Sequence, residues 1–172
     1  MSKIKILLIF LFILTVSLVY FCFNPIVIDN RNYNISYINQ YLVFEENVKI
    51  LKNIDFSKKE IKAILLIKDD INLSNKIKKG KVLVTNDIEI IKQIKNNWNF
   101  TKTNGDISTV ENELFIYENE KLILRTFIVL DDSVDSNING IQNTELGWLS
   151  SNYDIIEQCS KFKRVYFPII LL

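Results

Sequence analysis

The sequence contains no histidine and only two cysteines, four glycines and two prolines among its 172 residues. Without an imidazole, the chain by itself cannot form a Ser-His-Asp or Cys-His catalytic apparatus, a histidine proton shuttle or a histidine-containing metal site. Two cysteines cannot form a four-cysteine zinc site either. No phosphate-binding loop or dinucleotide fingerprint is present. These absences exclude many common classes of enzyme and metalloprotein, and the sequence indicates no cofactor.

No charge of one sign predominates, since 21 Lys and Arg face 20 Asp and Glu. Affinity for nucleic acid comes mainly from neutralised phosphates, so we expect no nucleic-acid partner. The charges are nevertheless segregated, with an excess of lysine in residues 49–102 and an excess of acid in residues 103–158. This pattern predicts solvated faces that partly neutralise one another. One alternative is an acidic face around Asp131, Asp132, Asp135 and Glu145 that binds a basic protein partner at the membrane. The other is an approach of Lys76, Lys78, Lys79 and Lys81 to anionic lipid headgroups.

An uncharged run from Ile6 to Phe23 consists mostly of Leu, Ile, Val and Phe. At about 1.5 Å per residue, a helix of this length spans about 27 Å, close to the hydrocarbon thickness of about 30 Å. Ile26 to Ile28 can extend the run past Pro25. The sequence therefore predicts a transmembrane signal anchor over residues 6–28, with Ile6 to Phe23 in contact with the lipid bilayer.

Two other fates of this segment compete with an uncleaved anchor. A signal peptidase could cut after Thr15-Val16-Ser17, although the apolar run is longer than the usual signal core of about 7 to 15 residues. Lipidation of Cys22 would normally require a small residue before the cysteine, where this chain has Phe21. Either event would give a secreted or lipidated product.

The orientation of the anchor follows from its basic flank. Lys3 and Lys5 precede the apolar run, whereas the first 20 residues after it contain only Arg31 as a basic residue. The positive-inside rule then predicts a cytosolic tail of residues 1–5 and an extracytoplasmic domain of residues 29–172. We expect a single-pass protein of the cell membrane.

The extracytoplasmic part is predicted to be an α+β domain, with about three helices packed on a mostly antiparallel sheet. The first helix is expected over residues 58–68. Ser57 and Glu60 form a potential capping box, and Ile61, Ile64 and Leu65 have the spacing of one buried helical face.

Two further helices are expected later in the chain. One follows an N-cap at Asn86, with a buried stripe of Ile88, Ile91, Ile94 and Trp98. The other begins at Ser151 with Asp154 in its first turn, and buries Ile155, Ile156, Cys159 and Phe162. Because Cys159 falls on this stripe, we expect it to be a buried, unreactive side chain.

The strands are predicted from short runs of apolar and β-branched residues. The clearest signal is a hairpin of residues 113–118 and 121–130 that turns at Asn119-Glu120. Residues 33–54 are compatible either with a helix over Ile35 to Phe44 or with a pair of strands. The remaining strands are expected at residues 81–85, 145–149 and 165–172, the last on an edge or with a bulge because of Pro168.

One local pattern resembles a metal-binding loop. Asp135, Asn137, Asn139 and Gly140 match the start of an EF-hand calcium loop, but the twelfth position, which should hold a bidentate acid, is Leu146. Glu145 lies one position too early. We therefore expect a polar surface loop, with a Ca²⁺ site at Asp135, Asn137, Asn139 and Glu145 as the alternative.

These features favour a non-catalytic binding or protective module, of the accessory or immunity type, anchored in the membrane. The alternative is a small carboxylate-dependent hydrolase, because two acids at a suitable separation are sufficient for such chemistry. Asp131 and Asp132 are the obvious pair, but neighbouring residues at a strand end point to opposite faces. We therefore predict no catalytic residues.

Overall fold

The structure is a computed structural model that describes residues 3–29, 43–44, 47–52, 54, 60–102, 112–131, 139–143, 147–151 and 153–172. The chain divides into two compact units. Unit 1 consists of residues 1–33 and 165–172, and unit 2 consists of residues 34–164.

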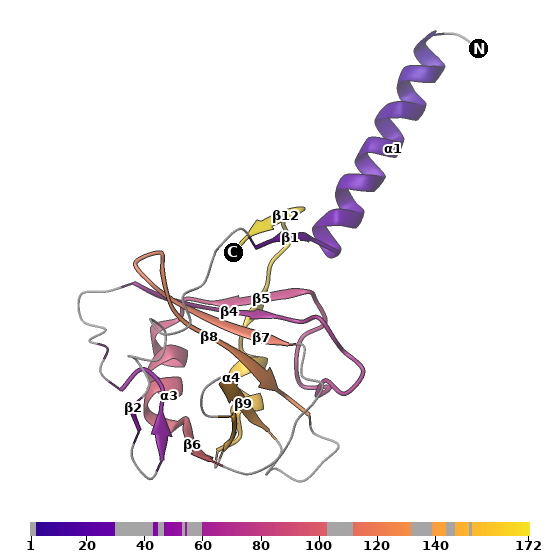
Figure 1. The fold of residues 1–172 in the computed structure, drawn as a ribbon. Coiled ribbons are helices and arrows are strands. Elements are labelled where there is room, and N and C mark those ends of the chain that lie inside the picture. The colour runs from indigo at the N-terminus through magenta and orange to yellow at the C-terminus, as the bar shows by residue number, and fades with distance from the viewer. Residues whose placement is uncertain are drawn as a thin grey trace. The chain divides into compact units, whose positions relative to one another are not determined.

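Unit 1 contains the apolar helix and a short two-stranded ribbon. Helix α1 spans Lys3–Phe23, and its mean hydropathy of 2.9 and its length suffice to cross a membrane. A signal sequence would satisfy the same criterion. Strand β1 (Ile26–Ile28) follows and pairs in parallel with β12 (Ile169–Leu171), which lies beside it in Figure 1. The part of the predicted span beyond Pro25 is thus a strand.

The described part of unit 2 contains a ten-stranded sheet in which every pair of neighbouring strands is antiparallel. The sheet bends, and helices α3 and α4 lie inside the bend (Figure 1). In spatial order, the strands are β11 (Lys163–Arg164), β5 (Val82–Thr85), β4 (Ile61–Leu66), β7 (Glu113–Glu118), β8 (Lys121–Val129), β9 (Gly140–Asn143), β10 (Gly147–Ser151), β6 (Asn99–Lys102), β3 (Val48–Lys49) and β2 (Val43–Phe44).

Strand β8 connects the two halves of the sheet. It pairs with β7 along most of its length, and its last three residues also pair with β9. The predicted β7–β8 hairpin is confirmed, and Asn119 and Glu120 turn with φ values of 47° and 67°. Two consecutive left-handed residues are typical of the tight turns that match the twist of a hairpin.

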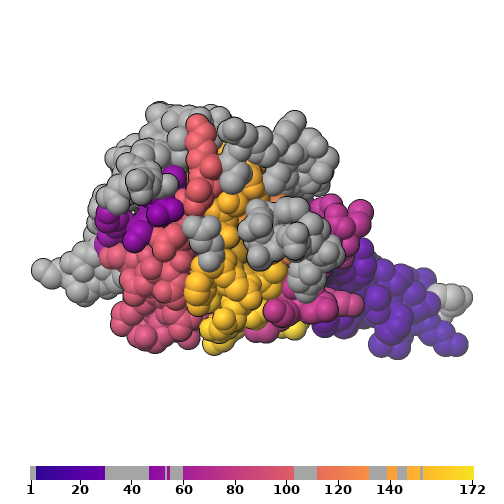
Figure 2. Space-filling view, turned by 90° about the horizontal axis from the view of Figure 1, so that it is seen from below, coloured from indigo at the N-terminus to yellow at the C-terminus, as the bar shows by residue number. Residues whose placement is uncertain are grey.

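Two helices lie in the described part of unit 2. Helix α3 (Ile88–Asn97) is capped by Asp87, one residue after the expected cap, and α4 (Ile155–Ser160) is capped by Asp154. The two helices lie side by side on the face shown in Figure 2. Lys161 Nζ, just after α4, donates to Gln93 Oε1 of α3 at 3.2 Å. Both helices are confirmed, although α4 begins later than Ser151.

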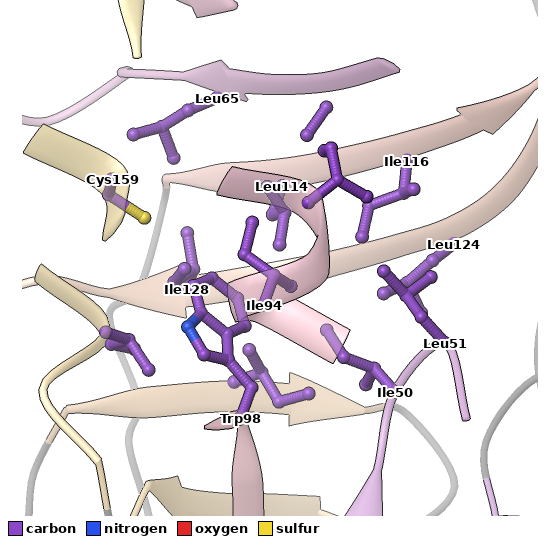
Figure 3. Packing of buried hydrophobic residues seen from close by; sticks show 14 of the residues in the cluster. Ile50, Leu51, Leu65, Ile94, Trp98, Leu114, Ile116, Leu124, Ile128 and Cys159 are labelled. Atoms are coloured by element: carbon purple, nitrogen blue, oxygen red, sulfur yellow. The ribbon is translucent and has the colours of Figure 1, made fainter. Parts of the chain in front are cut away.

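A single cluster of buried side chains joins the helices to both halves of the sheet (Figure 3). Trp98, at the end of α3, packs edge-to-face on Phe100 of β6 with ring centroids 6.0 Å apart. The predicted buried residues of α4 all belong to this cluster, as do Ile91 and Ile94 of α3. Ile88, which was expected on the same stripe, is exposed.

The helix predicted over residues 58–68 is wrong. Residues Ile61–Leu66 form β4, which lies between β5 and β7. Ile61, Ala63 and Leu65 belong to the core cluster, whereas Ile64 and Leu66 are buried on the opposite face. A strand buried on both faces carries a nearly continuous apolar run, and such a run also contains helical spacings. Ser57 lies outside the described residues.

Other expectations are confirmed in part. Residues 82–85 and 147–151 form strands, close to the predicted ranges. In the ambiguous region, Val43–Phe44 and Val48–Lys49 form a pair of antiparallel strands, while residues 33–42 lie outside the described ranges. Residues 165–172 do not form one antiparallel edge strand, because only Ile169–Leu171 are extended in a ladder and they pair in parallel with β1.

Candidate functional site

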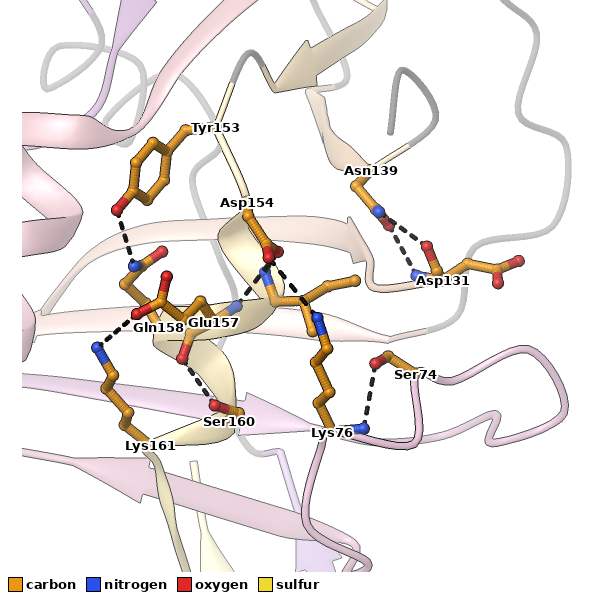
Figure 4. Close-up of polar contacts among 11 residues, drawn as sticks. Ser74, Lys76, Asp131, Asn139, Tyr153, Asp154, Glu157, Gln158, Ser160 and Lys161 are labelled. Carbon is orange, nitrogen blue, oxygen red and sulfur yellow. Dashed lines mark hydrogen bonds and ion pairs between the residues drawn. The ribbon is translucent and has the colours of Figure 1, made fainter. Parts of the chain in front are cut away.

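Asp131, which precedes the predicted polar loop, contacts Asn139 within it. Asn139 Oδ1 accepts a hydrogen bond from the Asp131 backbone N–H at 2.7 Å, and Asn139 Nδ2 donates to the Asp131 carbonyl at 2.8 Å (Figure 4). Asn139 is buried, and its carboxamide forms with the Asp131 backbone the pair of hydrogen bonds that a facing peptide group would form. The Asp131 carboxylate points away from Asn139.

The remaining candidates of this loop, Asp132, Asp135, Asn137 and Glu145, lie outside the described residues. The Ca²⁺ site and the acidic binding face therefore stay predictions. Within the described ranges, no group of three or more His, Cys, Asp or Glu side chains is placed to hold a metal ion.

Asp154 organises the start of α4. Its carboxylate accepts hydrogen bonds from the backbone amides of Ile156 at 3.1 Å and Glu157 at 3.3 Å, and Lys76 Nζ lies 3.9 Å away (Figure 4). Both partners of this ion pair are more than half exposed, so the pair itself adds little stability. The carboxylate acts as a helix cap.

Gln158 links α4 to the core. Its Oε1 accepts a hydrogen bond from Trp98 Nε1 at 3.2 Å, and its Nε2 lies 3.5 Å from the hydroxyl of Tyr153 (Figure 4). Gln158 is buried, so these hydrogen bonds satisfy polar atoms that water cannot reach. This arrangement fixes the position of α4 beside α3.

Cys159 is a buried residue of α4 with no exposed surface. Burial, with a smaller contribution from the negative charge of Asp154, raises the pKa of the Cys159 thiol well above its usual range. The thiol is therefore neutral at physiological pH. Because the thiolate is the nucleophile, this environment makes Cys159 unreactive.

The strongest charged cluster surrounds Glu113 of β7, which sequence reasoning missed. Its carboxylate is 3% exposed, and it accepts hydrogen bonds from Lys68 Nζ at 3.0 Å and from Arg125 Nη2 at 3.0 and 3.1 Å. Arg125 also lies over the ring of Phe115, 5.4 Å from its centroid. Glu113 thus receives two cations on the sheet face opposite the core cluster, an arrangement that neutralises a buried acid.

Unit 1 carries the largest exposed apolar surface among the described residues. None of the side chains of α1 is buried. At its end, Tyr20 and Phe21 pack edge-to-face at 5.5 Å, and Phe23 packs in the same way on Tyr166 at 5.5 Å. Sequence reasoning identified the helix but missed Tyr166 and Phe167, although residues 165–172 contain no charge and two adjacent aromatics.

Comparison with known proteins gives no relative: no protein-family model, curated protein or solved structure matches the chain.

Proposed function

We propose that the chain is a single-pass membrane protein, anchored by α1, whose extracytoplasmic part is a non-catalytic binding or protective module. The observation that carries the proposal is the apolar helix Lys3–Phe23, all of whose side chains lie outside any protein core. An exposed helix of this composition would be insoluble in water, whereas insertion in a bilayer satisfies both its side chains and its backbone.

The orientation of the anchor is proposed from its charges. Lys3 and Lys5 lie in the first turn of α1, whereas the first 20 residues after the apolar run contain Arg31 as their only basic residue. The positive-inside rule then favours a cytosolic N-terminus, with unit 2 on the extracytoplasmic side of the cell membrane.

A non-catalytic role is supported by the structural contacts that several of the described carboxylates make. Glu113 neutralises two cations, and Asp87 and Asp154 cap helices. Glu89 and Glu157 pair with lysines on their own helices or at the helix end. Each of these acids has a structural partner. The buried Cys159 thiol is equally unsuited to catalysis.

Membrane extraction with alkaline carbonate, combined with mass spectrometry, tests the anchor. We expect full-length protein of intact mass in the pellet, because residues 6–23 of α1 carry no charge that would oppose insertion. Intact protein in the soluble fraction would contradict the anchor. A product shortened near Ser17 or Cys22 would instead indicate cleavage or lipidation.

Cysteine labelling in intact cells tests the orientation. In a Cys22→Ser background, Glu89→Cys on the exposed surface of α3 should react with a membrane-impermeant maleimide, since buried Cys159 does not compete. The matched variant Ser2→Cys should react only after lysis. The reverse pattern would place unit 2 in the cytosol.

A photo-crosslinking amino acid at position 131 tests the binding module. We expect a crosslinked protein partner in cells when the crosslinker replaces Asp131, in the proposed acidic face. We expect no crosslinked partner when it replaces Glu89 on α3. Equal crosslinking at both positions, or none at position 131, would contradict an acidic binding face.

A further inference from the structure

Residues 166–172 are tied to the end of α1 by backbone and side-chain contacts. β1 begins three residues after Phe23, and the Ile26 N–H donates to the Pro168 carbonyl at 3.0 Å. The Leu172 N–H donates to the Ile28 carbonyl, also at 3.0 Å. Because the Tyr166 ring packs on Phe23, both aromatics of the Tyr166-Phe167 pair are held close to the point where α1 ends.

The ribbon of β1 and β12 presents one apolar face to its surroundings. In the parallel register, Ile26 lies opposite Ile169 and Ile28 lies opposite Leu171. Partners in register point to the same side of a sheet, so these four side chains share one face. All four are exposed, Leu171 to 71%. Residues 165–172 contain no charged side chain that would oppose contact with an apolar medium.

The depth of this face follows from the length of α1. A helix of 21 residues is about 32 Å long at 1.5 Å per residue, close to the hydrocarbon thickness of about 30 Å. Phe23 then lies at the hydrocarbon boundary. Tyr166, which packs on Phe23 and is 56% exposed, lies at the same level together with Phe167, which is 66% exposed. Tyrosine is enriched at this level in membrane proteins.

The ribbon is suited to the interface and not to the hydrocarbon core. In the described part of the chain, β1 and β12 pair only with each other, so each strand has a second edge of backbone groups that needs water or headgroups. An isolated two-stranded ribbon is also only marginally stable in water. At the membrane interface, lipid covers the apolar face of the ribbon, while water and headgroups hydrate its backbone edges.

We propose that the β1–β12 ribbon lies on the bilayer interface beside the end of α1, with its Ile26, Ile28, Ile169 and Leu171 face against the lipid and with Tyr166 and Phe167 among the headgroups. This inference rests on the proposed anchoring by α1. Its partner is lipid, because the ribbon is continuous with the membrane-spanning helix.

Depth-dependent fluorescence quenching tests the placement in full-length protein reconstituted into phosphatidylcholine vesicles. A nitrobenzoxadiazole label is attached at Phe167→Cys, at Phe12→Cys in the middle of α1, or at Glu89→Cys on α3, each in a Cys22→Ser background. Buried Cys159 stays unlabelled. Nitroxide lipids carry the quencher either near the headgroup or deep in the acyl chain.

We expect the label at position 167 to lose more fluorescence to the shallow quencher than to the deep one. The label at position 12 should show the opposite order, and the label at position 89 should be quenched by neither. If position 12 is quenched from the deep probe but position 167 is not quenched at all, or is quenched mainly from the deep probe, the ribbon proposal fails while the anchor stands. If position 12 is not quenched, both fail.

A substitution on the apolar face provides a second measurement. Ile169→Asp places a charge against the lipid and should reduce shallow quenching at position 167, because a charged side chain withdraws from the interface. The conservative variant Ile169→Val should retain the quenching. Equal quenching in both variants would overturn the role of this face, even with α1 inserted.

Discussion

The Glu113 cluster allows a quantitative test of how unit 2 is stabilised. The Glu113 carboxylate is 3% exposed, whereas its two partners are more accessible, Arg125 to 29% and Lys68 to 40%. The two sides of the cluster should therefore respond differently to mutation. A cation left alone can turn toward water, but a buried carboxylate cannot.

The exposures set the expected magnitudes. Arg125→Met leaves the buried acid with Lys68 only, and should lower the free energy of unfolding by about 3 kcal/mol, the lower end of the range for breaking a buried ion pair. Glu113→Leu leaves two half-exposed cations and should cost about 1 to 2 kcal/mol. The double variant should cost about as much as Glu113→Leu alone, since no buried charge remains.

Denaturant unfolding of the detergent-solubilised full chain measures these values. Trp98 and Trp148 are buried in unit 2, so tryptophan fluorescence reports on its unfolding. The exposed pair Glu89 and Lys92, 2.8 Å apart on α3, is the matched control and should show a coupling of about 0.5 kcal/mol or less. Additive effects at Glu113 and Arg125, within about 0.5 kcal/mol, would refute the role of the cluster.

Three further outcomes are expected. Folding raises the pKa of the Cys159 thiol from its ordinary value of 9.0. The thiol therefore does not destabilise the folded state below pH 9, but above pH 9 it ionises more readily in the unfolded state and the free energy of unfolding falls. At pH 10 the wild type should lose about 1.4 kcal/mol more than Cys159→Ala, as measured by unfolding at pH 8 and pH 10, and equal losses would refute this. Asp154→Ala should cost about 1 kcal/mol through loss of the α4 cap, and Asp154→Asn much less, in the same unfolding assay; equal costs would contradict a capping role. Addition of about 10 mM Ca²⁺ should leave the melting temperature unchanged, whereas a bound ion with a Kd of about 1 mM would raise it by roughly 2 to 5 °C, and a rise that Asp135→Ala abolishes would establish the calcium loop.

Elements with strong local signals could be predicted from the sequence. The β7–β8 hairpin has a turn at Asn119-Glu120 between two apolar runs, and both of its strands adjoin in sequence. α3 and α4 each follow a capping acid and place their apolar residues at helical spacing. The apolar helix is evident because Ile6 to Phe23 form an uncharged and mostly apolar run of 18 residues.

Elements that depend on distant pairing could not be predicted in this way. The run Ile61–Leu66 satisfies helical spacing, and only its position between β5 and β7 makes it a strand buried on both faces. The cluster at Glu113 joins β7 to Arg125 of β8 and to Lys68 beyond β4, and no local motif marks it. The β1–β12 pair joins segments from opposite ends of the sequence.

The candidate site likewise combines features with a local sequence signal and features that depend on distant pairing. The sequence predicted a polar loop from its turn residues, and the structure adds the pairing of Asn139 with the backbone of Asp131, which no local pattern indicates. The apolar face of the ribbon depends on the register of two distant strands, so the sequence of either strand alone does not reveal it.

The β1–β12 pairing also has a consequence for the order in which the chain acquires its structure. β1 is synthesised immediately after α1, but β12 becomes available only after all of unit 2 has been made. Closing a flexible loop as long as the chain between β1 and β12 costs about 4 kcal/mol of conformational entropy. Three residue pairs in a short ribbon contribute less stabilising free energy than that. The described strands and helices of unit 2 lie between β1 and β12 in the sequence, so folding of unit 2 already removes much of this loop entropy. The ribbon should therefore form last, and destabilising unit 2 should release residues 165–172 from the anchor.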